Sequence, residues 1–226
     1  MTRCTIGYIV VFTLVALGRV AGQAPPPNPQ QLFEAGQYDQ ATQAIATSRA
    51  QGAVGGPAEA FLAGHVFIRQ SLNDRAKEEF AKLVAAEDPI WKQVGESSIA
   101  AVDGDFDRAI AVATQAVTAA NERAAQAAAT GAPPDPAAQI RDFHAFYQLG
   151  LAKSRRDDWQ GAFDAFERAT ALNPGFAYAH YYAGMAASRI QRLDRVGLFL
   201  EQFLKLAPNA PERSAVMSVL QALRGT

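Results

Sequence analysis

The densest group of side chains that could do chemistry lies at residues 103–107 (Asp-Gly-Asp-Phe-Asp), where carboxylates alternate along the chain. Alternating acids open an EF-hand calcium loop, which then requires Gly at its sixth position and Glu at its twelfth. Arg108 and Thr114 stand at those two positions. The pattern therefore favours an ordinary turn before a helix, where acids near the first helical turn are stabilised by the helix dipole. We expect no calcium site.

The other groups capable of catalysis or metal binding lack the partners that such chemistry needs. His65, His144 and His180 show no His-x₃-His spacing and no acidic partner at ligand spacing. Ser97 and Ser98 lack the Gly-flanked elbow of a serine hydrolase. No Gly-rich loop that could hold a phosphate is present in the sequence. We therefore predict a protein that is not an enzyme and that uses no metal and no cofactor.

Residues 1–22 have the pattern of an export signal. A short basic start precedes an apolar run at residues 6–17, and Val20 and Gly22 occupy the −3 and −1 positions for cleavage before Gln23. The run is shorter than the roughly 20 apolar residues that span a bilayer. We predict a cleaved signal peptide and a periplasmic or secreted protein. The alternative is an uncleaved anchor that keeps the protein at the cell envelope.

The composition of the remaining chain excludes several classes of partner and chemistry. Residues 23–29 contain four prolines and predict an extended tether. The single cysteine, Cys4, falls within the predicted signal, so the exported part would have no disulfide. The formal net charge is −1, and loss of the two arginines in the signal would make the chain more acidic. Nucleic-acid binding needs a basic face, so we expect no nucleic-acid partner and no membrane contact beyond an uncleaved N-terminal segment.

From about residue 30 the chain repeats with a period close to 34 residues. Gly150 recurs as Gly184, and Phe166 recurs as Leu200, each after one full period. A period of this length is typical of stacked helical hairpins, in which each unit buries its apolar face only against its neighbours. We expect a repeat domain at residues 30–226 with repeats at about 30–52, 57–90, 90–123, 143–176 and 177–210, an insertion at 117–138 and a capping helix at 211–224.

Recurring glycines and prolines indicate how the expected helices pack and where they end. Gly64, Gly150 and Gly184 lie inside predicted helices, where Gly costs roughly 1 kcal/mol relative to Ala. A cost repeated at a fixed phase indicates that a neighbouring helix approaches closely. Pro174 and Pro208 end second helices, because the residue before Pro is displaced from the helical region. The expected helix pairs are 31–36 with 38–51, 57–71 with 73–86, 89–103 with 105–129, 139–155 with 158–171, and 176–190 with 192–206.

This pattern resembles the tetratricopeptide repeat family over about residues 30–208, and it is most complete in the last two repeats. Val196 and Phe203 depart from the motif where Ala is usual. The resemblance implies an all-α fold, a right-handed superhelical solenoid of antiparallel helix hairpins with a C-terminal capping helix. Residues 143–176 carry the motif at Phe146, Leu149, Gly150, Ala162, Phe166, Ala169 and Pro174.

The resemblance also implies a concave groove, because defined positions in the first helix of each hairpin face it in the family. In this sequence those positions hold aromatic side chains and three arginines, both of which are typical of binding hot spots. The alternative is that the aromatics pack against the neighbouring repeat and that the arginines pair with acids such as Asp157 or Asp194. The predicted groove residues are Phe61, His65, Ile68, Arg69, Trp91, Val94, His144, Tyr147, Leu151, Arg155, Tyr178, Tyr181, Met185 and Arg189.

We predict a non-enzymatic scaffold that binds a partner protein or an extended peptide in this groove outside the cytoplasm. The three arginines would favour acidic or carboxylate-bearing segments. The Lys and Asn set that holds a terminal carboxylate in co-chaperone members of the family is absent here. The alternative function is a structural or oligomerising component of a cell-envelope assembly, with self-association through the ends of the solenoid or through residues 117–138.

Overall fold

The computed structural model describes residues 28–52 and 55–225, so the predicted signal peptide and most of the predicted tether lie outside the described residues. Within these ranges the chain forms eleven helices and no strand. The expected helices are all observed, with ends that differ by a few residues. They are α1 (Pro29–Glu34), α2 (Tyr38–Ala50), α3 (Pro57–Arg69), α4 (Asn73–Val84), α5 (Pro89–Val102), α6 (Phe106–Thr130), α7 (Pro136–Ser154), α8 (Trp159–Leu172), α9 (Ala177–Arg189), α10 (Leu193–Leu206) and α11 (Arg213–Arg224).

Aspartates begin four of these helices. The carboxylates of Asp88, Asp105, Asp135 and Asp158 each accept a hydrogen bond from a backbone N–H in the first turn of α5, α6, α7 and α8. Such caps satisfy donors that have no partner inside the helix and are worth about 1 kcal/mol each. The cap at Asp135, followed by a proline at the first helical position, starts α7 three residues before the expected residue 139.

The turn inside each of the five hairpins places one residue in the left-handed region of the backbone. Gly36 and Gly104 supply φ angles of +73° and +82° in two of these turns. The same conformation is adopted without glycine by Ser71, Asp157 and Gln191, whose φ angles are 61°, 58° and 60°. Side chains with a Cβ pay roughly 1–2 kcal/mol in this region, so three of the five turns carry a conformational cost.

Replacing Gln191 by Gly is expected to raise the free energy of unfolding by about 0.5–1 kcal/mol, because Gly adopts positive φ without strain but loses more backbone entropy on folding. Urea denaturation followed by circular dichroism measures this change. The Gln191→Ala variant keeps the unfavourable conformation and is expected to remain within about 0.5 kcal/mol of the original chain. A Gly variant that is less stable than the Ala variant would contradict the account.

Glycines within first helices make room for a large side chain of the second helix. A Cβ added at Gly150 would lie 2.6 Å from the Phe166 ring, and one added at Gly184 would lie 2.6 Å from Leu200. The close approach expected from the sequence is therefore present. The groups that fill the space are the Phe166 and Leu200 side chains. Each of these hairpins is thus closed by one large residue seated on a glycine.

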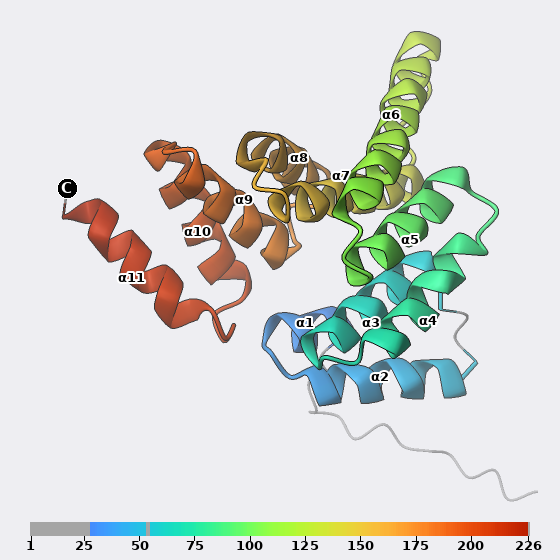
Figure 1. Cartoon of the computed structure of the whole chain (residues 1–226), viewed down its shortest axis with the longest axis horizontal. Coiled ribbons are helices and arrows are strands. Elements are labelled where there is room, and N and C mark those ends of the chain that lie inside the picture. The colour runs from blue at the N-terminus through green and yellow to red at the C-terminus, as the bar shows by residue number, and fades with distance from the viewer. Residues whose placement is uncertain (1–27, 53–54, 226) are drawn as a thin grey trace, which may run out of the picture.

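The insertion lengthens α6 into an arm. This helix runs for 25 residues and ends at Gly131, whose φ of 65° provides a left-handed cap. Figure 1 shows its last turns projecting beyond the other helices. An ion pair between Arg123 and Asp142 joins the arm to α7, and most side chains beyond Ala120 are exposed. The expected extension of this helix by several turns is confirmed.

The hairpins stack in chain order, and α11 closes the C-terminal end by burying Val216 and Leu220 against α10. No helix within the described ranges has both the length and the apolar character that crossing a bilayer requires. In Figure 1 the start of α11 lies next to the turn that follows α1. Gly36 in that turn is so close to Pro211 that an added Cβ would lie 2.5 Å from its ring. The first and last parts of the solenoid therefore touch.

Candidate partner-binding surface

The predicted groove residues lie on the first helices α3, α5, α7 and α9, except Arg155, which directly follows α7. The prediction that these aromatic side chains are open to solvent is wrong at five positions. Of the other nine predicted groove residues, the three arginines are exposed and Val94 is buried. The partly buried ones are His65, Ile68, Leu151, Tyr181 and Met185. The five buried residues are Phe61, Trp91, His144, Tyr147 and Tyr178.

These five are buried because the concave surfaces of separate repeats contact each other. The Phe61 ring of α3 lies 4.8 Å from the His144 ring and 6.2 Å from the Tyr147 ring, both on α7. The Trp91 ring of α5 also lies 4.8 Å from His144. Aromatic pairs at these separations add to the stabilisation that burial provides. The alternative in which the aromatics pack against other repeats therefore applies to this part of the surface.

Farther along the same side, the first two hairpins meet α9 and the residue that precedes α11. We call this the N–C contact, and it is formed by Phe33, Glu34, Arg69, Tyr178 and Glu212. The Phe33 ring of α1 lies 5.2 Å from the Tyr178 ring of α9. Glu34 Oε1 accepts a hydrogen bond of 2.9 Å from the backbone N–H of Ala177. Burial raises the pKa of this carboxyl above its usual range. The N-terminal helix thus contacts a helix that follows more than 140 residues later.

Polar groups complete the N–C contact around the Tyr178 hydroxyl. This hydroxyl donates to Glu212 at 2.9 Å and accepts a hydrogen bond of 2.9 Å from the Arg69 guanidinium. Arg69 also forms an ion pair with Glu212, and its guanidinium lies 5.2 Å from the centre of the Tyr178 ring. One of the three predicted groove arginines is therefore already neutralised by a carboxylate of this chain, and its partner is Glu212.

Two histidines lie in the contact between α3 and α7: His65 is partly buried and His144 is buried. Burial lowers the pKa of His65 to about 3 and that of His144 to about 4. His144 Nδ1 lies 2.6 Å from the Ile140 carbonyl oxygen, whereas His65 Nε2 is inaccessible and has no hydrogen-bond partner among the described residues. Both imidazoles are therefore neutral near pH 7, and their role is in packing.

The free energy of unfolding is expected to fall as the pH is lowered from about 6.5 to about 4, by up to about 1.4 kcal/mol per pH unit for each histidine. In this window the unfolded chain binds protons that the folded chain excludes at His65 and His144. Glu34, whose pKa is raised, has the opposite effect above its usual pKa. Urea denaturation between about pH 4.5 and 7.5 measures the slope. The His144→Gln variant is expected to have a shallower slope, and an equal slope would contradict the assignment.

The acidic turn and the two serines have structural partners. Asp105 caps α6, Asp103 pairs with Lys77 at 3.1 Å, and Asp107 pairs with Arg156. The three carboxylates therefore interact with three separate groups. The buried Ser97 hydroxyl donates a 2.8 Å hydrogen bond to the Ala109 carbonyl oxygen, and the buried Ser98 hydroxyl donates one of 2.8 Å to the Val94 carbonyl oxygen.

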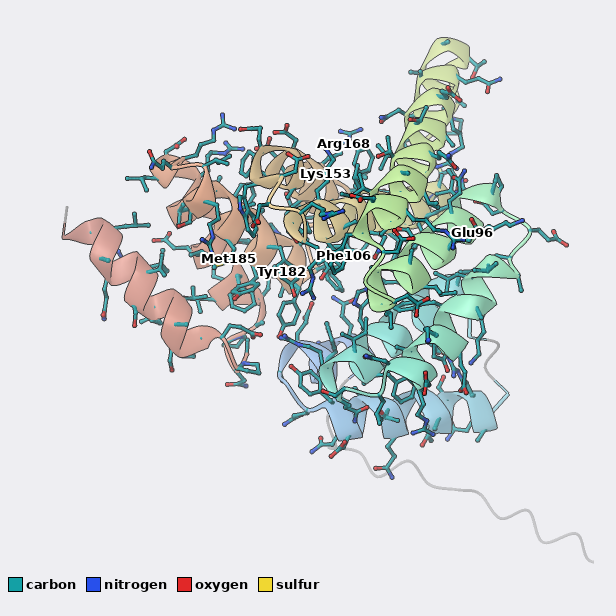
Figure 2. All side chains as sticks on the ribbon, viewed as in Figure 1. Glu96, Phe106, Lys153, Arg168, Tyr182 and Met185 are labelled. Carbon is teal, nitrogen blue, oxygen red and sulfur yellow. The ribbon has the colours of Figure 1, made fainter. Side chains whose placement is uncertain are left out.

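The part of the concave side that stays open lies between α7 and α9. A cavity of about 280 Å³ there is lined by Leu151, Arg155, Trp159, Tyr181, Met185 and Arg189, among others. A second cavity, of about 350 Å³, lies between the two halves of the solenoid. The two cavities share Leu151, Arg155 and Tyr182, so they adjoin. Figure 2 shows Tyr182 and Met185 together on α9, while Arg168 of α8 lies away from them. We call the two cavities together the α7–α9 groove.

Arginines give this groove its charge. Arg155 forms no ion pair or hydrogen bond through its side chain with any described residue, although it lies next to both cavities. The Arg189 guanidinium lies 5.1 Å from the centre of the Trp159 ring, which is a cation–π arrangement. Within the described ranges neither arginine pairs with Asp157 or Asp194, which was the alternative considered from the sequence. The groove thus combines aromatic walls with an available positive charge.

Two solved structures share this arrangement of helices. A thermophilic TPR protein of Thermus thermophilus is 18% identical to this chain, with a TM-score of 0.55 over 85% of this chain and 95% of its own. This chain has the tetratricopeptide-repeat fold. The APC/C hetero-tetramer Cut9-Hcn1 is 15% identical, with a TM-score of 0.51 over 86% of this chain. This tetratricopeptide-repeat chain spans only 34% of the length of that protein. No family model and no curated protein matches the sequence.

Several important residues of the site were not identified from the sequence. Phe33 and Glu34 lie in the incomplete first repeat, and Glu212 lies after the last one, so the tetratricopeptide motif assigns none of them a place in the groove. Tyr182 was missed because it precedes the motif glycine by two positions, outside the positions assigned to the groove.

Proposed function

We propose that this protein is a non-enzymatic scaffold that binds an extended acidic segment of a partner protein in the α7–α9 groove. The observation that carries the proposal is the unpaired guanidinium of Arg155 between two adjoining cavities with aromatic walls, within the part of the chain that the structure describes. The tetratricopeptide-repeat fold supports it, because helical-hairpin solenoids present concave surfaces that suit extended partners.

The chemistry of the groove favours a carboxylate-bearing segment. A guanidinium can donate two parallel hydrogen bonds to one carboxylate, and these charge-assisted bonds are stronger than neutral ones. Leu151, Tyr181 and Met185 offer apolar surface for the neighbouring side chains of the same segment. Cavities of this size with mostly apolar walls and a few polar groups are typical of binding sites. Arg155 would therefore orient the segment, and the apolar walls would supply contact area.

Replacing Arg155 by Ala is expected to reduce recovery of a partner at least about tenfold, since hydrogen bonds to charged groups contribute about 1.5–3 kcal/mol. Affinity capture from the protein's own cells, quantified by mass spectrometry, measures this loss. The Arg168→Ala variant is the matched control, because Arg168 is exposed outside the groove and its guanidinium lies 5.9 Å from the centre of the Phe146 ring. Equal recovery by wild-type chain and Arg155→Ala would contradict the proposal.

We also propose that the scaffold acts outside the cytoplasm, on the basis of the signal pattern in residues 1–22. Terminal sequencing of protein purified from its own cells tests this. A mature chain that begins at Gln23 supports export with cleavage. A chain that keeps residues 1–22 and sediments with membranes supports the anchored form instead.

A second candidate function is a self-associating component of an envelope assembly. The observation that favours it is the exposed end of α6, which projects from the solenoid (Figure 1). Size-exclusion chromatography with light scattering distinguishes the two functions, because assembly through this arm predicts a stable homo-oligomer of the full chain. A monomer at high concentration would contradict this second function.

A further inference from the structure

One segment of this chain, α1, packs against α2 and also reaches across the concave side to α9. The short helix α1 buries Leu32, Phe33 and Glu34, and it is followed by only a tight turn before α2. Phe33 contacts Tyr178, and Glu34 reaches the first residue of α9. The surface that receives α1 therefore shows which side chains it can accommodate.

We call the surface that receives α1 the seat of α1, and two chemical features define it. The first is aromatic, because the Phe33 ring lies 5.2 Å from Tyr178 and lines the same cavity as Tyr182 and Arg155. The second is the start of α9, which has no cap from its own N-cap residue, Phe176. Helix N-termini leave backbone donors unsatisfied and favour negative charge. Glu34 satisfies one of these donors from a distant part of the chain.

The seat of α1 is continuous with the α7–α9 groove. Phe33, Tyr178 and Arg155 line one cavity of about 350 Å³, so a segment held by Arg155 would extend to the place where α1 now lies. A ligand that fills both parts must displace Phe33. An aromatic ring and a carboxylate of its own would replace the lost contacts with Tyr178 and the Ala177 N–H most closely, because negative charge is favoured at the start of α9.

We propose that α1 occupies the place of the partner, and that the partner segment carries an aromatic side chain directly followed by a carboxylate, as Phe33 and Glu34 do. This inference rests on the proposed function and specifies its partner. The intact chain is then self-competing, because a tethered segment is present at a high effective concentration. Binding of the partner breaks the N–C contact and releases α1 from α9.

The test uses the full chain with α1 weakened. A fluorescein-labelled peptide of residues 28–37 is the probe, and the double variant Phe33→Ala/Glu34→Ala is the receptor, with fold checked by circular dichroism. Fluorescence anisotropy is expected to give a Kd for the double variant at least about tenfold lower than for the wild-type chain, whose own tethered α1 blocks the seat. A peptide in which Phe33 and Glu34 are both replaced by Ala is the matched control and is expected to bind neither chain.

Three results would overturn the inference. The first is a folded double variant that binds probe and control peptides equally. The second is a wild-type chain that binds the probe as tightly as the double variant. The third is a double variant that forms a stable dimer with wild-type chain and leaves the peptide free, which would make a second copy the occupant. The peptide-binding test leaves Arg155 unchanged, whereas the proposed function is tested by affinity capture with the Arg155→Ala variant. Failure of this inference can therefore be distinguished from failure of the proposed function.

Discussion

Replacing Tyr178 by Ala is expected to lower the free energy of unfolding by about 3–5 kcal/mol, the usual cost of truncating a buried aromatic residue. The Tyr178 side chain is only 1% exposed, and its ring contacts Phe33, Tyr182 and Phe203. The variant therefore loses contacts with α1 and α10 at once. Urea denaturation of the full chain measures the change, and the unfolding midpoint is expected to fall markedly.

The Tyr178→Phe variant separates the ring from the hydroxyl. It keeps the packing and removes one donor to Glu212 and one acceptor for Arg69, so a loss of about 1 kcal/mol is expected. A Tyr178 exposed in a solvated groove would instead tolerate Ala with a change of about 0.5 kcal/mol or less. Such a small effect would contradict the N–C contact and would restore the interpretation of Tyr178 as a solvent-exposed groove residue.

Replacing Gly95 by Ala is expected to destabilise the fold by about 1–3 kcal/mol, the usual cost of overpacking a core. An added Cβ would lie 2.7 Å from the Phe80 carbonyl oxygen, 2.8 Å from Leu83 Cβ and 2.9 Å from the Val84 nitrogen. Two of these atoms belong to the backbone of α4, so a side-chain rotation cannot relieve the clash. The helices α4 and α5 must separate, and thermal unfolding is expected to shift to lower temperature.

Gly197 provides the control for this substitution. It lies inside α10, and no atom lies within 4 Å of an added Cβ among the described residues. The Gly197→Ala variant is expected to gain about 0.5–1 kcal/mol from helix propensity alone. The same chemical change therefore has opposite signs at the two glycines. Destabilisation by both substitutions would show that helix geometry, and not the contact with α4, explains the effect at Gly95.

The helices were predictable because the signals that specify them are local. One or two repeats of the sequence are enough to recognise the 34-residue period, the prolines after α8 and α10 and the glycines of the first helices. The start of α7 before the predicted residue 139 also has a local cause, namely the Asp135 cap and the proline that follows it. The large residues seated on Gly150 and Gly184 follow from the same periodicity.

The candidate site was less predictable because its shape depends on the accumulated curvature of the repeats. Small rotations between successive hairpins decide whether the concave side stays open or meets itself, and no single residue encodes their sum. Phe33 and Tyr178 therefore gave no sign in the sequence that they would touch. Of the positions assigned to the groove, only Arg155 and Arg189 are both exposed and without an ion pair among the described residues.

The N–C contact also changes how such an array loses structure. In an open row of repeats each unit contacts only its neighbours, so the terminal units can fray without disturbing the centre. Here Glu34 and Arg69 connect the first hairpins to α9 and Glu212, so neither end can fray without the other losing a partner. The two weakest units of a linear chain become coupled. The repeats are then expected to unfold as a closed cooperative unit, and a partner that opened this contact, as proposed above, would lower that cooperativity.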